Sequence, residues 1–409
     1  MSELNIKNEI NRCFNCINKP CFKGCPLNND ISSIIKLMKN NKMKEAYNLL
    51  SETTILPSIC GRICPCEKQC KLNCTRKYKS EAIDIGTIES YLGDTAIKEN
   101  WEIPNFSNDL NNKKIAVIGS GPAGLTCATF LKRNGADVTI YEKKEHLGGL
   151  LRYGIPEFRL EKSILDESIK HICNTGINVI TKYDLSDQIE LLKEKYDAIF
   201  LSFGSNIPKK MNIDGESLPW VFDGNELLEN GISFDCTGKN VYICGGGNVA
   251  LDTARTIKRC GASKVTILYR REEERMPAEK KEVSSAKREK IEFKFNTNLL
   301  KIYERDGKGK IECAKTCEVG LGVQNIQNSN FVLDADFVIM AIGSKPDENL
   351  IKKLKLETDK NGFVKVDENN CTSDEKIFAG GNLVGAKATV AWAARSGREA
   401  AQSMINLLK

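Results

Sequence analysis

The chain has 409 residues, which is enough for two to four domains that each bury a core. Hydrophobic residues make up 41% and charged residues 28% of the sequence, and this composition excludes a disordered or fibrous protein. The net charge of +6 comes from basic residues interleaved with acidic ones, as in residues 270–275, so we expect no nucleic-acid binding.

Hydrophobic runs in the sequence are short. None approaches the roughly 18 consecutive apolar residues that a membrane span requires. The first residues also lack the apolar stretch and the small-residue cleavage site of a secretory signal. We therefore expect a cytoplasmic protein with no membrane partner.

Cysteine is concentrated near the beginning of the chain. Of 17 cysteines, nine lie between Cys13 and Cys74. Their spacing is Cys13-x2-Cys16-x4-Cys21-x3-Cys25-Pro, followed by Cys60-x3-Cys64-Pro-Cys66-x3-Cys70-x3-Cys74. Thiolates suit iron, and a terminal Cys-Pro is typical of ferredoxin runs. Zinc sites usually have two matched pairs of cysteines, and this crowded pattern does not divide into such pairs. We therefore favour iron–sulfur clusters over zinc, and we rank disulfides last.

The segments between and after these cysteines are predicted to be helical. Apolar residues recur at three- and four-residue spacings in 31–38 and 46–50. Residues 100–112, with Pro104 and several Asn and Asp, predict a linker.

A first nucleotide-binding pattern follows the linker. Residues 114–119 predict a strand, 124–133 a helix and 137–142 a second strand. Between the first strand and the helix lies a G-x-G-x-x-G loop, which lets a pyrophosphate approach the positive end of a helix. Glu142 ends the second strand, where a carboxylate accepts ribose hydroxyls. The loop consists of Gly119, Ser120, Gly121, Pro122, Ala123 and Gly124.

The same order of elements recurs further along the chain. A strand from Asn240, a helix over 248–259 and a strand over 264–270 surround a G-x-G-x-x-A loop made of Gly245, Gly246, Gly247, Asn248, Val249 and Ala250. Arg270 and Arg271 take the place that Glu142 has in the first unit, and arginine pairs with a 2′-phosphate that a carboxylate would repel. The alternative is a surface arginine pair beside Glu272–Glu274. The first site fits FAD and the second NADPH, and two such units predict two parallel sheets.

The sequence lacks the cysteine pair of flavin enzymes that reduce disulfides. Cys236 and Cys244 are eight residues apart, and 148–154 contains no cysteine. Electrons are therefore expected to leave through the clusters. Hydride transfer from nicotinamide to flavin depends on stacking and orientation, so we expect no catalytic acid or base. His146 and His171 are expected to be surface or packing residues.

With these motifs, the chain resembles the small subunit of NADPH-dependent glutamate synthase and the N-terminal part of dihydropyrimidine dehydrogenase over essentially its whole length. The resemblance rests on Cys25-Pro-Leu, Cys60-Gly-Arg-Ile-Cys-Pro, Ile83-Asp-Ile-Gly, Gly154-Ile-Pro-Glu-Phe-Arg-Leu, Tyr269-Arg-Arg, Met276-Pro-Ala and Ala379-Gly-Gly-Asn.

The resemblance implies two [4Fe-4S] clusters with crossed ligation. One would take Cys13, Cys16, Cys21 and Cys74, and the other Cys25, Cys64, Cys70 and Glu89. Cys60 and Cys66 would then be spare. Relatives have an amide at the Glu89 position, which leaves that ligand open.

The resemblance also implies an α/β fold with a helical iron–sulfur domain at residues 1–108. An FAD domain would comprise 113–236 and 341–409, with an NADPH domain inserted at 237–340. Asn382 stands where the family usually has Asp against the ribityl chain, and Thr389 to Ala391 would begin a last helix whose positive end faces the flavin. The remaining cofactor-binding candidates are Gly149, Gly343, Gly381 and Val390.

These features describe electron entry only. The expected partner is a separate catalytic subunit, such as a glutamate synthase large subunit or a pyrimidine-reducing subunit, or else a ferredoxin-linked partner as in transhydrogenases. Two alternatives remain: a non-catalytic redox or nucleotide sensor, and a stand-alone NADPH oxidase acting on small acceptors.

Overall fold

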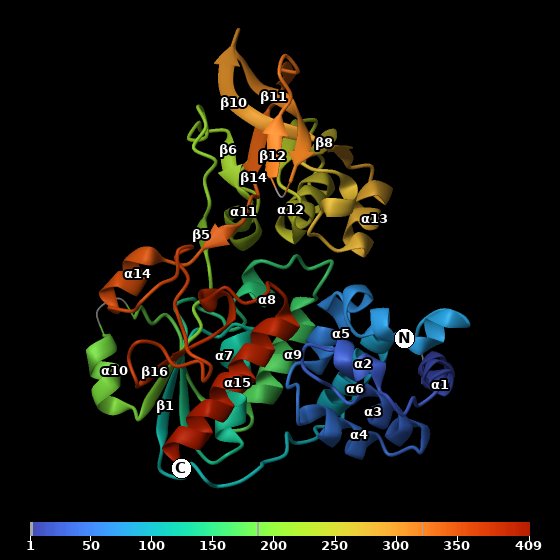
Figure 1. Ribbon diagram of the computed structural model, residues 1–409, viewed down its shortest axis with the longest axis vertical. Coiled ribbons are helices and arrows are strands. Elements are labelled where there is room, and N and C mark those ends of the chain that lie inside the picture. Colours follow the sequence, from blue (N-terminus) through green and yellow to red (C-terminus); the bar gives the residue numbers. More distant parts are fainter. Residues whose placement is uncertain (1–2, 186–187, 321) are drawn as a thin grey trace. The chain divides into compact units, whose positions relative to one another are not determined.

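The structure is a computed structural model that describes residues 3–185, 188–320 and 322–409 (Figure 1). The chain forms two compact units. The first comprises Met1–Arg152, Glu157–Ser205 and Pro346–Lys409, and the second comprises Tyr153–Pro156 and Asn206–Lys345. No helix within the described ranges is long and apolar enough to cross a membrane.

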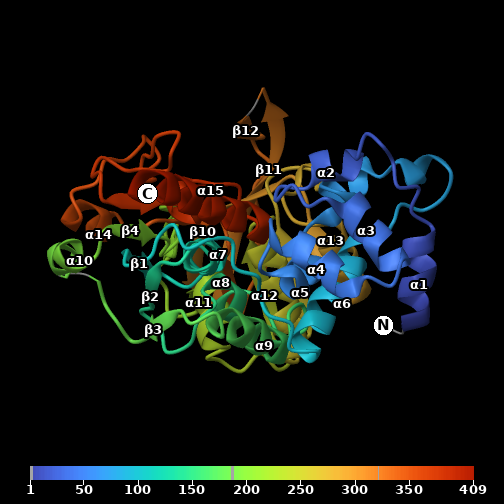
Figure 2. The ribbon, with the colours of Figure 1, turned by 90° about the horizontal axis from the view of Figure 1, so that it is seen from below.

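The N-terminal part of the first unit is helical, as predicted, and its helices gather around one another in Figure 2. The helices α5 and α6 come closest, because a Cβ on Gly61 would lie 2.3 Å from the Gly86 oxygen. This glycine contact brings the segment after Cys60 against the helix that bears Glu89. The helices are α1 (Glu3–Asn11), α2 (Pro20–Gly24), α3 (Ile31–Lys39), α4 (Met43–Ser51), α5 (Pro57–Ile63) and α6 (Ile85–Lys98), with 3-10 turns η1 (Cys66–Lys68), η2 (Lys71–Asn73) and η3 (Thr75–Tyr78).

A five-stranded parallel sheet forms the rest of the first unit, in the order β16-β4-β1-β2-β3. Its strands are β1 (Lys114–Ile118), β2 (Asp137–Tyr141), β3 (Asn178–Ile180), β4 (Ala198–Leu201) and β16 (Ile377–Ala379). The accompanying helices are α7 (Pro122–Lys132), α8 (Leu150–Tyr153), α9 (Lys162–Cys173), α10 (Ile189–Lys195), α14 (Glu348–Lys353) and α15 (Val390–Leu408), with a 3-10 turn η5 (Gly381–Val384).

The last helix, α15, packs along α7 (Figure 1). The two helices can approach closely because a Cβ on Gly397 would lie 2.1 Å from the Ala123 oxygen. Helix α9 contacts the N-terminal helices, since the Tyr47 hydroxyl of α4 hydrogen-bonds with His171 Nε2 at 2.9 Å. His171 is thus a packing residue, and His146 is exposed at the surface.

The second unit contains another five-stranded parallel sheet, in the order β6-β14-β7-β8-β9. The two predicted parallel sheets are therefore confirmed. The strands are β6 (Val221–Asp223), β7 (Asn240–Cys244), β8 (Lys264–Leu268), β9 (Glu292–Lys294) and β14 (Phe337–Met340), and the helices are α11 (Gly224–Asn230), α12 (Asn248–Arg259) and α13 (Lys280–Arg288), with a 3-10 turn η4 (Glu273–Arg275).

An antiparallel sheet that the sequence analysis did not predict covers part of the second unit. Strand β11 (Lys308–Val319) pairs with β10 (Thr297–Arg305), β12 (Gly322–Asn325) and β13 (Phe331–Asp334). Its buried residues, Ile311 and Cys313 among them, share a core with Tyr242 and Leu268 of the parallel sheet. A short pair, β5 (Ile207–Pro208) and β15 (Ser344–Lys345), joins the chain where it enters and leaves this unit.

The structure differs from the predicted boundary at residue 236. Strand β6 pairs in parallel with β14, and α11 follows it, so residues 206–236 belong to the second unit rather than to the first. The exit also moves, from residue 340 to Lys345. The recurring strand–loop–helix pattern marks only the middle of such a sheet, and the edge strand β6 has three residues and no pattern of its own.

Candidate functional site

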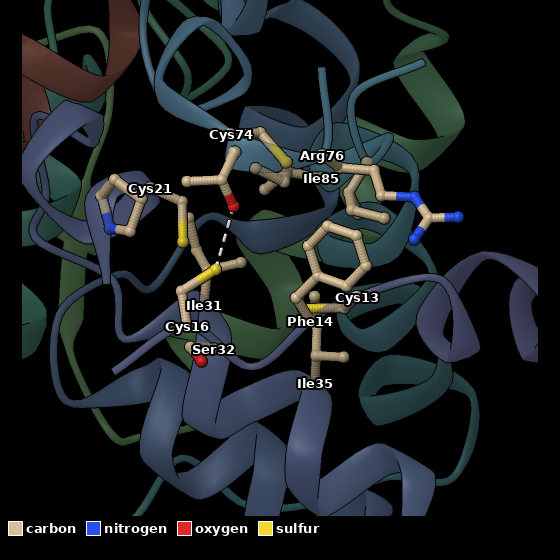
Figure 3. Close-up of a pocket in the computed structure, with 13 residues that line it drawn as sticks. Cys13, Phe14, Cys16, Cys21, Ile31, Ser32, Ile35, Cys74, Arg76 and Ile85 are labelled. Atoms are coloured by element: carbon tan, nitrogen blue, oxygen red, sulfur yellow. Dashed lines mark hydrogen bonds between the residues drawn. The ribbon is translucent and has the colours of Figure 1, made fainter. Parts of the chain in front are cut away.

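Four thiols from distant parts of the N-terminal segment line one pocket (Figure 3). Cys13 follows α1, Cys16 and Cys21 flank the start of α2, and Cys74 lies between two 3-10 turns. The structure therefore brings together the four residues that the resemblance assigned to one cluster.

The wall of this pocket is largely apolar. It includes Phe14, Ile31, Ile35, Ile83 and Ile85. Burial raises the pKa of the Cys21 thiol to about 11 and also raises that of Cys13. Polar groups are few: Cys16 Sγ lies 3.0 Å from Thr75 Oγ1, and the Asn15 N–H donates to Cys13 Sγ over 3.5 Å. Such apolar surroundings keep water away from metal-bound sulfur.

A second group of candidate ligands surrounds α5, α6 and the loop after Cys25. Burial and the nearby Glu89 raise the pKa of Cys25 to about 12. A hydrogen bond with Cys60 and burial raise the pKa of Cys64, and a hydrogen bond with Cys66 and burial raise that of Cys70. All four residues assigned to the other cluster, Cys25, Cys64, Cys70 and Glu89, are thus neighbours.

Cys60 and Cys66, the two spare thiols, belong to this same neighbourhood. Burial, followed by the charges of Cys60 and Cys66, raises the pKa of Glu89 well above its ordinary value. Cys66 Sγ also lies 3.3 Å from the place that a Cβ on Gly86 would take, one helical turn from Glu89. The structure thus offers six donor side chains where a cluster needs four.

The donor chemistry fits iron–sulfur clusters. Within residues 3–185, 188–320 and 322–409, no three His, Cys, Asp or Glu side chains converge closely enough to hold one metal ion. The thiols of the first pocket instead surround an open space. A cubane cluster is larger than one ion and takes four thiolates, and loading it releases protons from thiols whose pKa burial has raised.

The first glycine loop connects β1 to α7. Gly119 has a φ of +95°, and a Cβ on Gly124 would lie 1.9 Å from the Gly119 oxygen. By contrast, among the described residues other than its two chain neighbours, no atom lies within 4 Å of the place that a Cβ on Gly121 would take, and Gly121 itself offers no side chain to cap the N-terminus of α7. The loop therefore leaves free space directly at the first helix N–H groups, those of Ala123 and Gly124, where a pyrophosphate fits.

Glu142 lies at the end of β2 and faces this loop. Its Oε2 accepts from the Ser120 backbone N–H over 2.9 Å and from Ser120 Oγ, while its Oε1 accepts from the Lys144 N–H over 2.9 Å. These three donors hold the carboxylate beside the loop, as ribose binding requires. Gly149 belongs to the same neighbourhood, since a Cβ on it would lie 2.9 Å from Gly121 Cα.

The C-terminal candidates lie on η5 and at the beginning of α15. The Gly381 N–H donates to Ser396 Oγ over 3.0 Å, which fixes the turn that carries Asn382. Thr389 caps α15 by accepting from the Trp392 N–H over 3.4 Å, so the helix begins at Val390, one residue later than expected. The structure places both segments in the same unit as the first glycine loop.

The second glycine loop has the same construction in the second unit. Gly245 has a φ of +146°, and a Cβ on it would lie 2.2 Å from the Ala341 oxygen. Space is free at Gly247, where, of the residues that the structure describes and apart from its two chain neighbours, none has an atom within 4 Å of a Cβ position. Asn248 begins α12 and accepts from the Glu279 N–H over 3.1 Å, and Val249 follows it. Gly343 lies beyond β14, and its oxygen accepts from the Lys209 N–H over 3.0 Å.

Arg270 and Arg271 follow β8, as predicted. Thr316 Oγ1 donates to the Arg270 oxygen over 2.9 Å, and the Asn296 N–H donates to the Arg271 oxygen over 3.1 Å, so the antiparallel strands fix this turn. Within the described ranges the exposed Arg270 guanidinium has no ion-pair partner, and Glu273, three residues further on, pairs with Lys287. A free guanidinium at this point can bind an anion.

The supporting roles of three residues were not predicted from the sequence. Ser120 binds Glu142 and also accepts from the Gly148 N–H over 3.1 Å, Ser396 holds Gly381, and Glu279 holds Asn248. Only Ser120 had a signal, since it lies inside the glycine loop. Ser396 and Glu279 are far from the loops in sequence, and only the fold brings them near.

Comparisons with known proteins agree with both halves of this arrangement. The pyridine nucleotide-disulphide oxidoreductase family matches residues 113–400, and dihydropyrimidine dehydrogenase domain II, with its 4Fe-4S cluster, matches residues 1–101. The small chain of NADPH glutamate synthase from Escherichia coli is 34% identical over 100% of this chain and 92% of its own length. The chain belongs to the glutamate synthase small-chain family, within the pyridine nucleotide-disulphide oxidoreductases.

Two further relatives are similar over most of the chain. The glutamate synthase small chain of Azospirillum brasilense is 32% identical over 98% of this chain and 89% of the relative. NADPH-Fe(3+) oxidoreductase subunit beta of Geobacter sulfurreducens is 32% identical over 84% of this chain and 53% of the relative.

Solved structures show the same fold. FprA of Mycobacterium tuberculosis, in complex with NADPH, superposes on the present chain with a TM-score of 0.63 at 18% identity. The match covers 72% of the present chain and 84% of FprA. A 2-naphthoyl-CoA reductase covers 91% of the chain and 49% of the reductase, with a TM-score of 0.60 at 16% identity. The predicted fold class is confirmed.

The present chain is therefore an electron-transferring oxidoreductase whose cofactors are a flavin, a nicotinamide nucleotide and iron–sulfur. All 17 cysteines are free thiols, and buried Cys244 contacts Met211 Sδ over 3.7 Å.

Proposed function

We propose that this chain takes a hydride from NADPH and passes the electrons one at a time to a separate catalytic subunit. FAD and two [4Fe-4S] clusters would supply the redox chemistry, and the protein supplies binding, orientation and exclusion of water. The observation that carries this proposal is that the first glycine loop and both groups of candidate cluster ligands lie in one compact unit, with α15 in contact with both parts.

The flavin would bind at the first glycine loop. The free space at Gly121 accommodates its pyrophosphate, and Glu142 accepts hydrogen bonds from its ribose. The N-terminus of α15 supplies unpaired N–H groups for the negative edge of the reduced ring system. The residues that we propose for FAD are Gly119, Gly121, Pro122, Ala123, Gly124, Glu142, Gly149, Gly381, Asn382, Thr389 and Val390.

The dinucleotide that donates the hydride would bind at the second loop. Arg270 has no ion-pair partner among the described residues, which supports a role in binding the 2′-phosphate of NADPH. Relatives from three bacteria carry NADPH in their names, which agrees with this choice. The proposed residues are Gly245, Gly247, Asn248, Val249, Arg270, Arg271 and Gly343.

Each cluster would take ligands from both ends of the cysteine-rich segment. Cys13, Cys16, Cys21 and Cys74 line one pocket, and this supports one cluster there. Cys25, Cys64, Cys70 and Glu89 would hold the other. Crossed ligation ties the beginning of the segment to its end, so each cluster would also stabilise the helical fold.

The proposed partner is a larger subunit of the glutamate synthase type. The relatives in Escherichia coli and Azospirillum brasilense are named small chains, and the chain spans about nine tenths of each. A pyrimidine-reducing subunit or a ferredoxin-linked partner would use the same electron entry.

Iron counting on cysteine variants tests the arrangement. Cys74→Ser should lose about half of the iron per chain and keep its FAD, because it opens one pocket of thiols only. Cys317→Ser is the matched control, since Cys317 is exposed on β11 in the other unit, and it should keep all the iron. Unchanged iron in Cys74→Ser would contradict the proposed ligands.

A further inference from the structure

Two arginines of α15 reach across to the N-terminal helices. Arg398 Nη1 donates to the Leu27 oxygen over 2.8 Å and to the Thr53 oxygen over 2.7 Å. Arg395 Nη1 donates to the Pro26 oxygen over 3.1 Å. Pro26 and Leu27 follow Cys25 directly in the sequence, so the last helix holds the loop of a proposed cluster ligand.

A chain of hydrogen bonds continues from Thr53 to Glu89. Thr53 Oγ1 donates to Asn29 Oδ1 over 2.7 Å, and Asn29 Nδ2 donates to Glu89 Oε1 over 3.3 Å. Asn29 is only 1% exposed, so this contact is shielded from water. The Asn29 amide thus bridges the Thr53 hydroxyl and Glu89 Oε1, and this contact engages one of the two Glu89 oxygens.

The two arginines differ in their charge balance. Arg395 pairs with Glu399 across 2.7 Å, whereas Arg398 has no carboxylate within ion-pair distance among the residues that the structure describes. Burial lowers the pKa of Arg398, and the nearby Glu399 and Cys25 oppose that effect. A half-buried cation whose hydrogen bonds, among the described residues, go to carbonyl oxygens stabilises negative charge nearby.

We propose that Arg398 is a positioning residue for the second iron–sulfur site: it holds the Cys25 loop and the Thr53–Asn29–Glu89 chain, and its charge favours the reduced state of that cluster. The inference rests on the proposed function. One-electron reduction adds one negative charge and neither makes nor breaks a bond, so a fixed positive charge raises the reduction potential. A higher reduction potential of the second cluster would favour electron flow from the flavin to that cluster, which is the proposed direction.

The test is a redox titration of the full chain followed by electron paramagnetic resonance. Arg398→Met and Arg398→Gln both remove the charge, and the glutamine keeps a donor for the carbonyl oxygens. Arg398→Lys is the matched control that keeps the charge. Cys64→Ser and Cys74→Ser identify which signal belongs to which cluster.

We expect both neutral variants to make reduction of the second cluster about tenfold less favourable, which is a downward shift of about 59 mV for a one-electron couple. Arg398→Lys should stay close to the wild type, and the first cluster should not change. Selective loss of the second cluster in the neutral variants, with retention in Arg398→Lys, would also support the proposal.

Unchanged potentials in the neutral variants, or equal shifts of both clusters, would overturn it. Thr53→Val adds an independent check, because it removes the hydroxyl and leaves the backbone contact with Arg398. It should alter the signal of the second cluster alone. An identical signal would contradict a role of the Thr53–Asn29–Glu89 chain in positioning the second cluster. A wild-type chain without clusters would instead contradict the proposed function itself.

Discussion

The two glycine loops have the same backbone design but different charges beside them. Gly119 and Gly245 both have positive φ angles, and each presses against the end of the neighbouring strand, at Ser202 and at Ala341. Both loops leave open space at the third residue, Gly121 or Gly247. At the end of the second strand, however, the first unit has Glu142 held by three donors, and the second has Arg270 without an ion-pair partner among the described residues.

This difference separates binding from selectivity. The loop and the helix N-terminus supply a site for any pyrophosphate, because only backbone groups are involved. A single side chain some 20 residues later then determines which ribose fits. Changes in either loop should therefore weaken nucleotide binding at that site. Changes at the strand end should instead alter which nucleotide each site prefers.

The largest expected effect comes from filling the open space. Gly121→Ala should lower FAD affinity at least about 100-fold, or about 3 kcal/mol, because the methyl group would occupy the place of the pyrophosphate. Gly247→Ala should weaken NADPH binding similarly and leave the flavin content unchanged. Flavin-to-protein ratios and NADPH titrations measure both. Equal loss of flavin in the two variants would show that the sites are not separate.

Gly124→Ala is the control for this pair. Gly121 and Gly247 have φ angles of −68° and −89°, which alanine adopts without strain, so thermal unfolding of the apoprotein should change little. A Cβ on Gly124 would collide with the Gly119 oxygen. This variant should therefore lose folded protein as well as flavin, as measured by circular dichroism.

A smaller effect is expected from the strand end. Arg270→Ala should raise the KM for NADPH about ten- to a hundredfold, since a hydrogen bond to a charged group contributes about 1.5–3 kcal/mol, and it should leave the KM for NADH almost unchanged. Arg270→Lys should give an intermediate value. If both dinucleotides were affected equally, Arg270 would have no part in reading the 2′-phosphate.

The smallest effect concerns the support of Glu142. Ser120→Ala removes one of the three donors to the carboxylate and the acceptor for the Gly148 N–H, so FAD affinity should fall about fivefold, or about 1 kcal/mol. Flavin release during dialysis or a direct titration measures this. A loss as large as that of Gly121→Ala would mean that Ser120 itself contacts the cofactor.

Much of the architecture could be predicted because its signals are local. The glycine loops, their flanking strands and the helix over 248–259 follow from spacing and periodicity, and the structure confirms them. The antiparallel strands β10–β13 were missed because half-exposed strands lack a strong pattern, and the short β6 displaced the domain boundary.

The proposed metal sites depend on contacts that no spacing predicts. The position of Cys66 follows from the close packing of α5 and α6 at Gly61 and Gly86, and only the structure shows that Cys66 lies near Glu89. The interaction of Arg398 with the loop after Cys25 likewise joins residues that are 371 positions apart.

The most direct measurement is an anaerobic visible spectrum of the purified chain, with iron and flavin counted, before and after NADPH is added. We expect a brown protein with about eight irons and one FAD per chain, whose flavin bands NADPH bleaches. A colourless or zinc-bound protein, or one whose spectrum NADPH leaves unchanged, would contradict electron entry and favour a non-catalytic sensor.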